Sequence, residues 1–333
     1  MKKFLIRVLS FVGIPIVILA VVYLVTDPFK TLKPFVFRYF DTTNQDYLTS
    51  EVFLRNDPVY HYNAFVFGSS RCNWMNSWHW KHYLPTDTRQ FMFRAWSETL
   101  TGIEQKIDYL DRNGNAIDHA LVVLDIPKTF SKVQLSHKVV YIKHYKFSGQ
   151  SQWGFQACLF FGFVQKPSKW IESIQQYCNN KTETIFYDTV TNDWDSGYRL
   201  ADWTIQPPKD NLWGWSEKNR TVFLKQIEGL SEADVLVSEP LITDDFQKQL
   251  RHIKAVFDKH HTDYRIVVSP AYCYTHPSIN TQDLDILKEI FGSDRVYDYS
   301  GKSDLTSDCY NFTDADHFGL SVGWQIIEDI YNK

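Results

Sequence analysis

Short apolar runs separated by turn residues recur along two parts of the chain. Runs of apolar, aromatic or β-branched residues, each bounded by turn residues, occupy 63–68, 89–96, 119–126, 263–270 and 294–300. Continuous apolar runs of this length are typical of strands that are covered on both faces. The pattern therefore predicts five buried strands.

Apolar residues recur at helical spacing between and after these runs. The helical stretches are 97–114, which begins with the common N-cap residue Ser97, and 242–261, 281–292 and 319–333. Strands that alternate with helices predict a three-layer α/β/α domain with a five-stranded parallel sheet and helices on both faces. A site in such a sheet is expected at the carboxyl ends of the strands.

Residues 127–240 interrupt the alternation of strands and helices, and we interpret them as a large tryptophan-rich insertion. They contain six of the eleven tryptophans, namely Trp153, Trp170, Trp194, Trp203, Trp213 and Trp215. Two interpretations stay open. The indoles form the small core of the insertion, or their faces stack on sugar rings in a glycan groove or lid.

The N-terminal segment is apolar enough to predict a transmembrane helix over 8–26. No charged residue occurs from Val8 to Val25, and about 18 helical residues nearly match the thickness of the hydrocarbon core. A cleaved signal peptide is the alternative, but no small-x-small site precedes Thr26. Basic residues before the span favour a cytoplasmic N-terminus at 1–7, and hence a single-pass membrane protein whose main domain is extracytoplasmic.

The remaining organisation follows from the prolines and from composition. Prolines at 28, 34 and 58 indicate an irregular tether over 27–60, which leaves 61–333 as the folded domain. With 333 residues, 44% of them hydrophobic, disorder is excluded, and a net charge of -4 implies no attraction to nucleic acid.

Nothing in the sequence indicates a metal or a cofactor. Five cysteines occur without a C-x-x-C pair, so disulfides are permitted but not required, and no structural metal is expected. His79 and His82 have a spacing that can bind a metal, yet no further ligand accompanies them, and we expect surface or interface histidines. No cofactor is expected.

The candidate chemistry begins where the first predicted strand ends, at Gly68-Ser69-Ser70. A serine at this place can cap a helix and nothing more, or it can be a nucleophile that needs a base within hydrogen-bond reach. Asp314 and His317 lie three residues apart just before the last predicted helix. This spacing allows the carboxylate to orient the imidazole as in a Ser-His-Asp triad.

The chain resembles the SGNH (GDSL-type) hydrolase superfamily in the order of these motifs. In both, the nucleophile follows the first strand and an Asp-x-x-His block precedes the last helix. The resemblance covers about 60–126 and 242–333 and implies a flavodoxin-like sheet, with Ser70 as nucleophile, His317 as general base and Asp314 as its orienting partner. The wider pattern is similar to membrane-anchored members of bacterial envelopes. It implies a serine esterase or O-acyltransferase that acts on acylated cell-envelope polysaccharide through an acyl-serine. The single span at 8–26 separately predicts contact with membrane lipid and a membrane protein partner.

The chain departs from the family pattern in the block that supplies the oxyanion donors. Where the family has Gly-x-Asn-Asp, this chain has Val122-Val123-Leu124-Asp125, and leucine cannot donate. Losing one of about three donors costs on the order of 10²-fold in rate. A catalytically inactive glycan-binding or envelope-assembly factor is therefore the alternative function.

Several further residues are candidates for binding substrate or stabilising an oxyanion. Gly68 allows the turn, and Gly102 is the nearest match to the family's second glycine. Arg71 can hold an anion or a carbonyl oxygen, or pair with an aspartate. Asp125 can cap a turn or line the crevice, and Asp316 is the alternative partner of His317.

Overall fold

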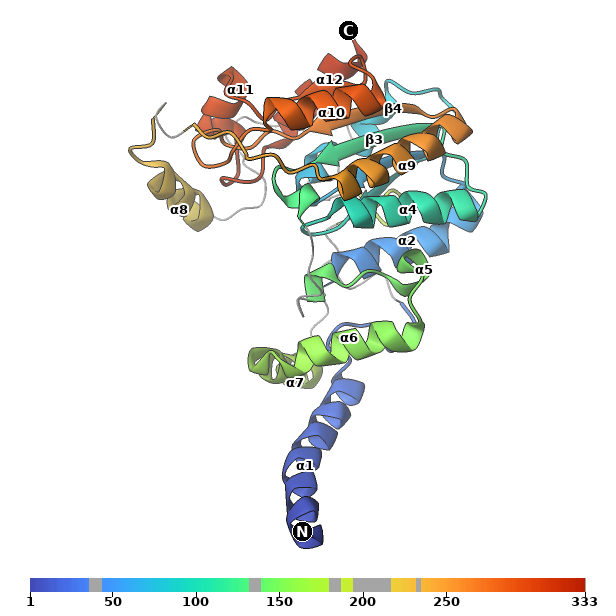
Figure 1. Ribbon diagram of the computed structural model, residues 1–333, viewed down its shortest axis with the longest axis vertical. Helices are drawn as coiled ribbons and strands as arrows, with labels where there is room; N and C mark the ends of the chain where they lie inside the picture. The colour runs from blue at the N-terminus through green and yellow to red at the C-terminus, as the bar shows by residue number, and fades with distance from the viewer. Residues whose placement is uncertain (36–43, 132–138, 180–186, 194–216, 232–234, 333) are drawn as a thin grey trace. The chain divides into compact units, whose positions relative to one another are not determined.

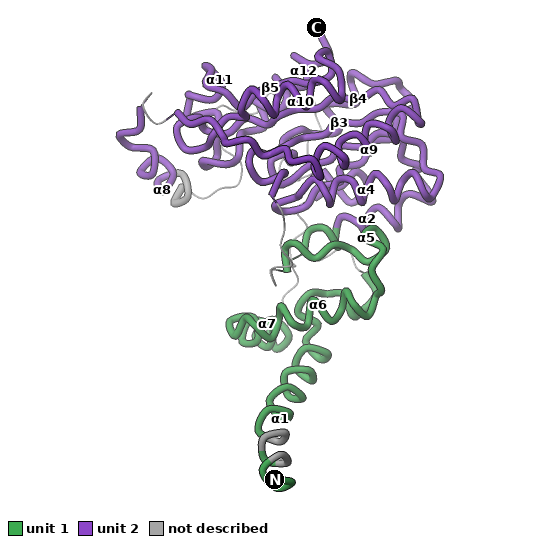
Figure 2. Tube along the Cα trace, viewed as in Figure 1, with its two compact units in different colours: residues 1–48, 134–185 green, residues 49–133, 186–333 purple. Residues whose placement is uncertain are grey.

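The computed structural model describes residues 1–35, 44–131, 139–179, 187–193, 217–231 and 235–332. The chain divides into two compact units, which Figure 2 shows in different colours. The smaller unit comprises 1–48 and 134–185, and the larger comprises 49–133 and 186–333. The predicted triad residues all belong to the larger unit.

The larger unit contains a five-stranded, all-parallel sheet in the order β2-β1-β3-β4-β5. Its strands are β1 (Ala64–Gly68), β2 (Gln90–Arg94), β3 (His119–Leu124), β4 (Asp263–Val268) and β5 (Val296–Asp298). The chain runs from β1 to β2 on one side and then crosses to β3 on the other. The strand order thus reverses between β1 and β3, where sheets of this kind place their ligands.

Helices cover both faces of the sheet, as Figure 1 shows. One face packs against α4 (Leu100–Arg112), α9 (Asp244–His260) and α10 (Thr281–Phe291), and the other against α3 (Ser77–Lys81) and α12 (Leu320–Tyr331). On the first face, Tyr264 of β4 stacks on Phe257 of α9 and contacts Phe291 of α10. On the second, Val66 of β1 shares a buried cluster with Ile326 of α12. The predicted α/β fold with a parallel sheet is confirmed.

The segment expected to be an irregular tether is in part a helix. Residues Gln45–Tyr60 form α2, and Phe53 of this helix contacts the rings of Phe65, Phe91 and Phe93 on the sheet. Pro58 lies in the last turn of the helix, so the hydrogen bond that its missing N–H cannot make is lost only near the helix end. The proline was therefore a poor reason to exclude a helix, and 45–60 is part of the packed structure.

Helix α4 begins later than predicted. Thr99, not Ser97, caps α4, since the Thr99 hydroxyl accepts a hydrogen bond from the Gly102 N–H. Ser97 has a φ of 51°, in the left-handed region. The shorter helices of this unit are η1 (Ser70–Trp74), η2 (Lys128–Phe130), α8 (Glu217–Ile227), α11 (Asp304–Ser307) and η5 (Cys309–Asn311).

The smaller unit is helical. It contains α1 (Lys2–Thr26), η3 (Val139–Tyr141), α5 (Tyr145–Ser148), α6 (Gln152–Val164) and α7 (Pro167–Asn179). Tyr23 of α1 contacts the rings of Phe160 and Phe163 of α6. A helix covers the predicted span at 8–26, but within the described residues no helix is long and apolar enough to cross a membrane. The transmembrane prediction is therefore unsupported by the structure.

The predicted insertion at 127–240 contributes helices to both units. Trp153 is 86% exposed, so it does not belong to a core, and Trp170 donates its indole N–H to the Phe163 carbonyl at 2.7 Å. The other four tryptophans of the insertion, Trp194, Trp203, Trp213 and Trp215, lie outside the described residues. The choice between a glycan groove and a small core therefore stays open for them.

Candidate active site

Ser70 begins the short helix η1 immediately after the buried strand β1. A Cβ on Gly68 would lie 2.9 Å from the Cys72 Cβ and 3.1 Å from the Val123 Cβ, so only glycine fits at the strand end. The Ser69 hydroxyl accepts a hydrogen bond from the Arg71 N–H at 3.2 Å. Of the two serines, Ser69 is thus the helix cap, and the Ser70 hydroxyl does not serve as the cap.

His317 lies in a tight loop between η5 and α12. Phe312 and Phe318 flank the loop, pair through a backbone bridge and are fully buried. The backbone N–H and hydroxyl of Thr313 both donate to the His317 carbonyl, at 2.8 and 3.0 Å. Because the loop is held at both ends and across its middle, the imidazole has a defined position.

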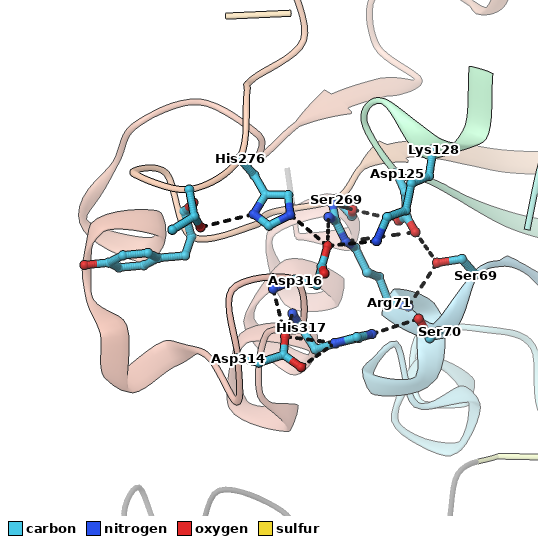
Figure 3. Close-up of polar contacts among 12 residues, drawn as sticks. Ser69, Ser70, Arg71, Asp125, Lys128, Ser269, His276, Asp314, Asp316 and His317 are labelled. Atoms are coloured by element: carbon cyan, nitrogen blue, oxygen red, sulfur yellow. Dashed lines mark hydrogen bonds and ion pairs between the residues drawn. The ribbon is translucent and has the colours of Figure 1, made fainter. Parts of the chain in front are cut away.

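The structure brings Ser70, His317 and Asp314 together in one chain of hydrogen bonds, which Figure 3 shows. The Ser70 Oγ lies 2.8 Å from His317 Nε2, and His317 Nδ1 lies 2.9 Å from each carboxylate oxygen of Asp314. With its Nδ1–H donated to Asp314, the imidazole presents the Nε2 lone pair to the serine hydroxyl. This is the arrangement that a serine nucleophile needs.

Asp314 is set up to remain ionised. Burial raises the pKa of its carboxyl. The hydrogen bond and charge of His317, together with two backbone N–H groups, lower the pKa by more than burial raises it, so the net pKa lies below the usual value. The backbone donors are those of Asp316 and His317, each 2.8 Å from Oδ1. Ser70, Asp314 and His317 are all partly exposed, so a substrate can reach the triad.

Asp316 does not serve as the partner of His317. Its Oδ1 lies 2.8 Å from His276 Nε2, 2.9 Å from Arg71 Nη2 and 3.0 Å from Lys128 Nζ. The His276 hydrogen bond and the Arg71 charge outweigh the effect of burial and hold the pKa of Asp316 well below its usual range. Asp316 therefore ties the histidine loop to the residues that follow β1, β3 and β4.

Asp125 lies beneath the nucleophile at the end of β3. It accepts hydrogen bonds from the Ser69 hydroxyl and, at 2.9 Å, from the Ser269 hydroxyl. Arg71 donates to the Ser269 hydroxyl at 3.3 Å, and its Nε lies 4.0 Å from Asp125. Arg71 and Asp125 are both nearly fully buried, so they support the serine turn, and the Arg71 guanidinium is held by Ser269, Asp125 and Asp316.

Leu124 and Gly102 are the two positions that correspond to the family's oxyanion donors. Leu124 is buried and pairs with Val268 in the sheet, and its side chain has no polar atom. The Gly102 N–H donates to the Thr99 hydroxyl at 3.4 Å in the first turn of α4. The helix cap thus uses the Gly102 N–H, and the role of Gly102 as an oxyanion donor stays a prediction.

Asn73 is a candidate donor that the sequence analysis missed. Ser70 and Asn73 are three residues apart in the 3₁₀ helix η1, in which residues at this spacing lie above one another. The Asn73 Oδ1 accepts a hydrogen bond from Arg94 Nη1 at 3.4 Å, which turns its NH₂ group away from the guanidinium. The Ser70 N–H is a second candidate donor, because the N–H at the first position of η1 has no acceptor within that helix. The only sequence signal was the amide three residues after the serine.

Gly323 is a second residue that the sequence analysis did not single out. A Cβ on Gly323 would lie 2.6 Å from the carbonyl carbon of Trp74 and closer still to its oxygen. Trp74 is in η1 with Ser70, and Gly323 is in α12, which begins three residues after His317. This glycine therefore sets how closely the elements that carry the nucleophile and the base approach.

His79 and His82, whose spacing can bind a metal, lie next to an aromatic contact with α12. The His79 ring stacks on Trp324 with centroids 4.7 Å apart, and burial, together with the nearby His82, lowers the pKa of His79 to about 4. In the part of the chain that the structure describes, no group of three or more His, Cys, Asp or Glu side chains is placed to hold a metal ion. All five cysteines are free thiols.

Comparison with models of known protein families finds no match to this chain. Comparison with curated protein sequences finds none either.

Proposed function

We propose that this chain is a serine esterase or O-acyltransferase that works through an acyl-serine intermediate. The observation that carries the proposal is the continuous hydrogen-bonded chain from Ser70 through His317 to Asp314. Support also comes from its place, since Ser70 lies at the carboxyl end of β1, beside the point where the strand order reverses.

The reaction begins when the Ser70 hydroxyl passes its proton to His317 Nε2. The Ser70 Oγ then forms a bond to the ester carbonyl carbon, and the carbonyl electron pair moves onto oxygen. When that oxyanion collapses, the bond to the leaving oxygen breaks, and His317 returns the proton to it. Asp314 stabilises the imidazolium in between. Water or a sugar hydroxyl then attacks acyl-Ser70 by the same steps in reverse.

The developing oxyanion needs hydrogen-bond donors. Two candidate donors belong to the same short helix as the nucleophile. The Ser70 N–H and the Asn73 NH₂ group both belong to η1. In this proposal Asn73 supplies the amide that other members of the superfamily place after the third strand, where this chain has Leu124. One such donor contributes on the order of 10²- to 10³-fold in rate.

The substrate class rests on the SGNH resemblance, and the location rests on the apolar segment 8–26 and the basic residues before it. On that basis we propose an acylated cell-envelope polysaccharide as the substrate, an extracytoplasmic site and a membrane anchor at residues 8–26. The anchor is a prediction that cell fractionation tests: the full chain should stay with membranes after extraction at high salt and high pH. Recovery in the soluble fraction would contradict it.

The alternative function is a catalytically inactive glycan-binding or assembly factor. Leu124, buried where an amide is expected, is the observation that favours it. Such a protein would bind polysaccharide without turning over an ester.

One experiment separates the two functions. The full chain in detergent micelles is incubated with p-nitrophenyl acetate and, separately, with O-acetylated polysaccharide, and released or transferred acetyl is measured. The proposal expects turnover that Ser70→Ala abolishes. Polysaccharide binding that Ser70→Ala leaves unchanged, with no turnover by the wild type on either ester, would favour the inactive binding protein.

A further inference from the structure

Helix α6 of the smaller unit is apolar on both of its faces. One face is buried, with Phe155, Leu159 and Phe163 almost inaccessible to solvent. The opposite face exposes Trp153 and Phe161, which are 86% and 61% exposed. No charged residue occurs between Gln152 and Val164. A helix at a water-facing surface normally has a polar outer face, so this one is unusual.

Helix α7, which packs against α6, has an exposed apolar stripe of its own. Ile171 and Ile174 are exposed and lie three residues apart, so they share one side of the helix. Trp170 joins the two helices, because its indole N–H donates to the Phe163 carbonyl at 2.7 Å. We call Trp153, Phe161, Ile171 and Ile174 the α6–α7 apolar residues.

The surroundings of these residues favour lipid as their partner. Helix α1, whose Tyr23 hydroxyl donates to Gln156 of α6, is itself apolar around its circumference. Its exposed large side chains include Phe11, Ile14, Val17, Ile18, Val21 and Leu24. A single protein partner would have to cover three helices with outward apolar side chains, whereas a lipid phase contacts all of them.

The charges next to the apolar residues also fit a bilayer surface. Lys166 is exposed in the turn between α6 and α7, and Lys169 follows it. Glu172 is the only acidic residue of the two helices, and it pairs with Lys169 at 3.0 Å. Basic side chains beside exposed aromatic and aliphatic ones are typical of helices that lie in the headgroup region of a membrane.

We propose that α6 and α7 form a membrane-surface element, with the α6–α7 apolar residues inserted at the boundary between headgroups and acyl chains. Trp153 suits this depth because indole combines a large apolar face with an N–H donor. The proposal does not require α1 to cross the bilayer, and it is independent of the chemistry proposed for Ser70.

The test is a depth measurement on the full chain. Cys158 is exposed on α6, so an environment-sensitive NBD fluorophore is attached there after Cys178→Ser and Cys309→Ser remove the other accessible thiols. The matched control carries the label at Lys248→Cys, an exposed position of α9 in the larger unit, with Cys158→Ser added. Vesicles contain phosphatidylcholine and phosphatidylglycerol, with a quencher attached to the lipid at headgroup or acyl depth.

We expect the label on α6 to shift to the blue and to be quenched from the headgroup–acyl boundary, while the control label stays in water. If α1 alone recruits the chain, both labels remain unquenched on bound vesicles, and the proposal is overturned. A blue shift that grows with protein concentration without vesicles would overturn it in favour of contact with a second copy.

A substitution pair gives a second readout. Trp153→Ser with Phe161→Ser should remove most of the blue shift and lipid quenching of the label on Cys158, because two large apolar side chains no longer enter the lipid, even where α1 keeps the chain on the vesicle. Val59→Ser removes an apolar side chain that is 72% exposed on α2 of the larger unit, and it should leave both signals unchanged. Equal signals from the double variant and the Val59 control would contradict the proposal, provided that circular dichroism shows both to be folded.

Discussion

Replacing Gly323 by alanine inserts a methyl group between the two elements that carry the proposed nucleophile and base. The added Cβ would lie 2.6 Å from the carbonyl carbon of Trp74 in η1. Ordinary contact between carbon atoms needs about 3.5–4.0 Å. The obstacle is backbone, so no side chain can rotate away, and η1 and α12 must separate by about 1 Å or more.

That separation acts directly on the triad. The Ser70 Oγ to His317 Nε2 distance is 2.8 Å, and a hydrogen bond of this kind weakens beyond about 3.2 Å. A misplacement of about 1 Å costs on the order of 10²-fold in rate. Overpacking of a tight interface also costs about 1–3 kcal/mol of folding free energy. We therefore expect a folded but less stable protein whose serine reacts about 10²-fold more slowly.

The assay measures the rate of labelling by a fluorophosphonate and the midpoint of urea unfolding. The matched control is Gly301→Ala, because a Cβ at Gly301 meets no atom within 4 Å. The control should match the wild type in both measurements. If Gly323→Ala also matches the wild type in both, the close approach of α12 and η1 does not hold the triad together, and the reasoning fails.

Three further predictions concern single side chains. Asp314→Asn should lower esterase kcat by about 10⁴-fold, because an amide no longer stabilises the imidazolium; a loss below tenfold would contradict the role of Asp314. Asn73→Ala should lower kcat by about 10²- to 10³-fold with KM little changed, and a change in KM alone would exclude an oxyanion donor. Asp193 is buried, and burial raises the pKa of its carboxyl from 3.8 to about 6. The folded state therefore holds a proton that the unfolded chain loses as pH rises from about 4 to 6, and stability falls by about 3 kcal/mol across that window. Asp193→Asn should remove this fall, which urea unfolding at pH 4.5 and 7 measures; an unchanged slope would refute it.

The sheet could be predicted because each of its strands is apolar along its whole length. The five apolar runs correspond to β1–β5 within a few residues, and β1 and β4 end where Ser69 and Ser269 follow. Local pattern also indicated the Asp314 and His317 pair, since the two residues are close in sequence. Ser70 meets His317 because the strands are parallel, so the segments that follow β1 and β5 lie at the same edge of the sheet.

The residues that escaped prediction depend on contacts distant in sequence. Helix α2 carries Pro58, and the packing of the buried Phe53 on the sheet explains why 45–60 is a helix that belongs to the fold. Gly323 is unremarkable in an apolar helix until Trp74 lies against it. Asn73 of η1 gains its orientation from Arg94, which is in strand β2. Such relations cannot be seen in the periodicity of one chain.

The choice between Ser97 and Thr99 as the cap of α4 has a different cause. Both residues are good caps, and the hydrophobic period alone cannot place a helix end to within two residues. In the structure Glu98 accepts the Thr99 N–H at 2.9 Å and pairs with buried Lys106. The later helix start goes together with this buried pair of Glu98 and Lys106. The two residues are eight positions apart, so the hydrophobic period did not indicate the pair.

The most direct test of the account is whether Ser70 is an activated nucleophile. The full chain in detergent is treated with a fluorophosphonate, and the modified residue is identified by peptide mass spectrometry in the wild type, Ser70→Ala and His317→Ala. The account predicts an adduct on Ser70, not on neighbouring Ser69, and loss of labelling in both variants. A folded wild type that takes no label, or an adduct that forms equally fast in His317→Ala, would contradict it.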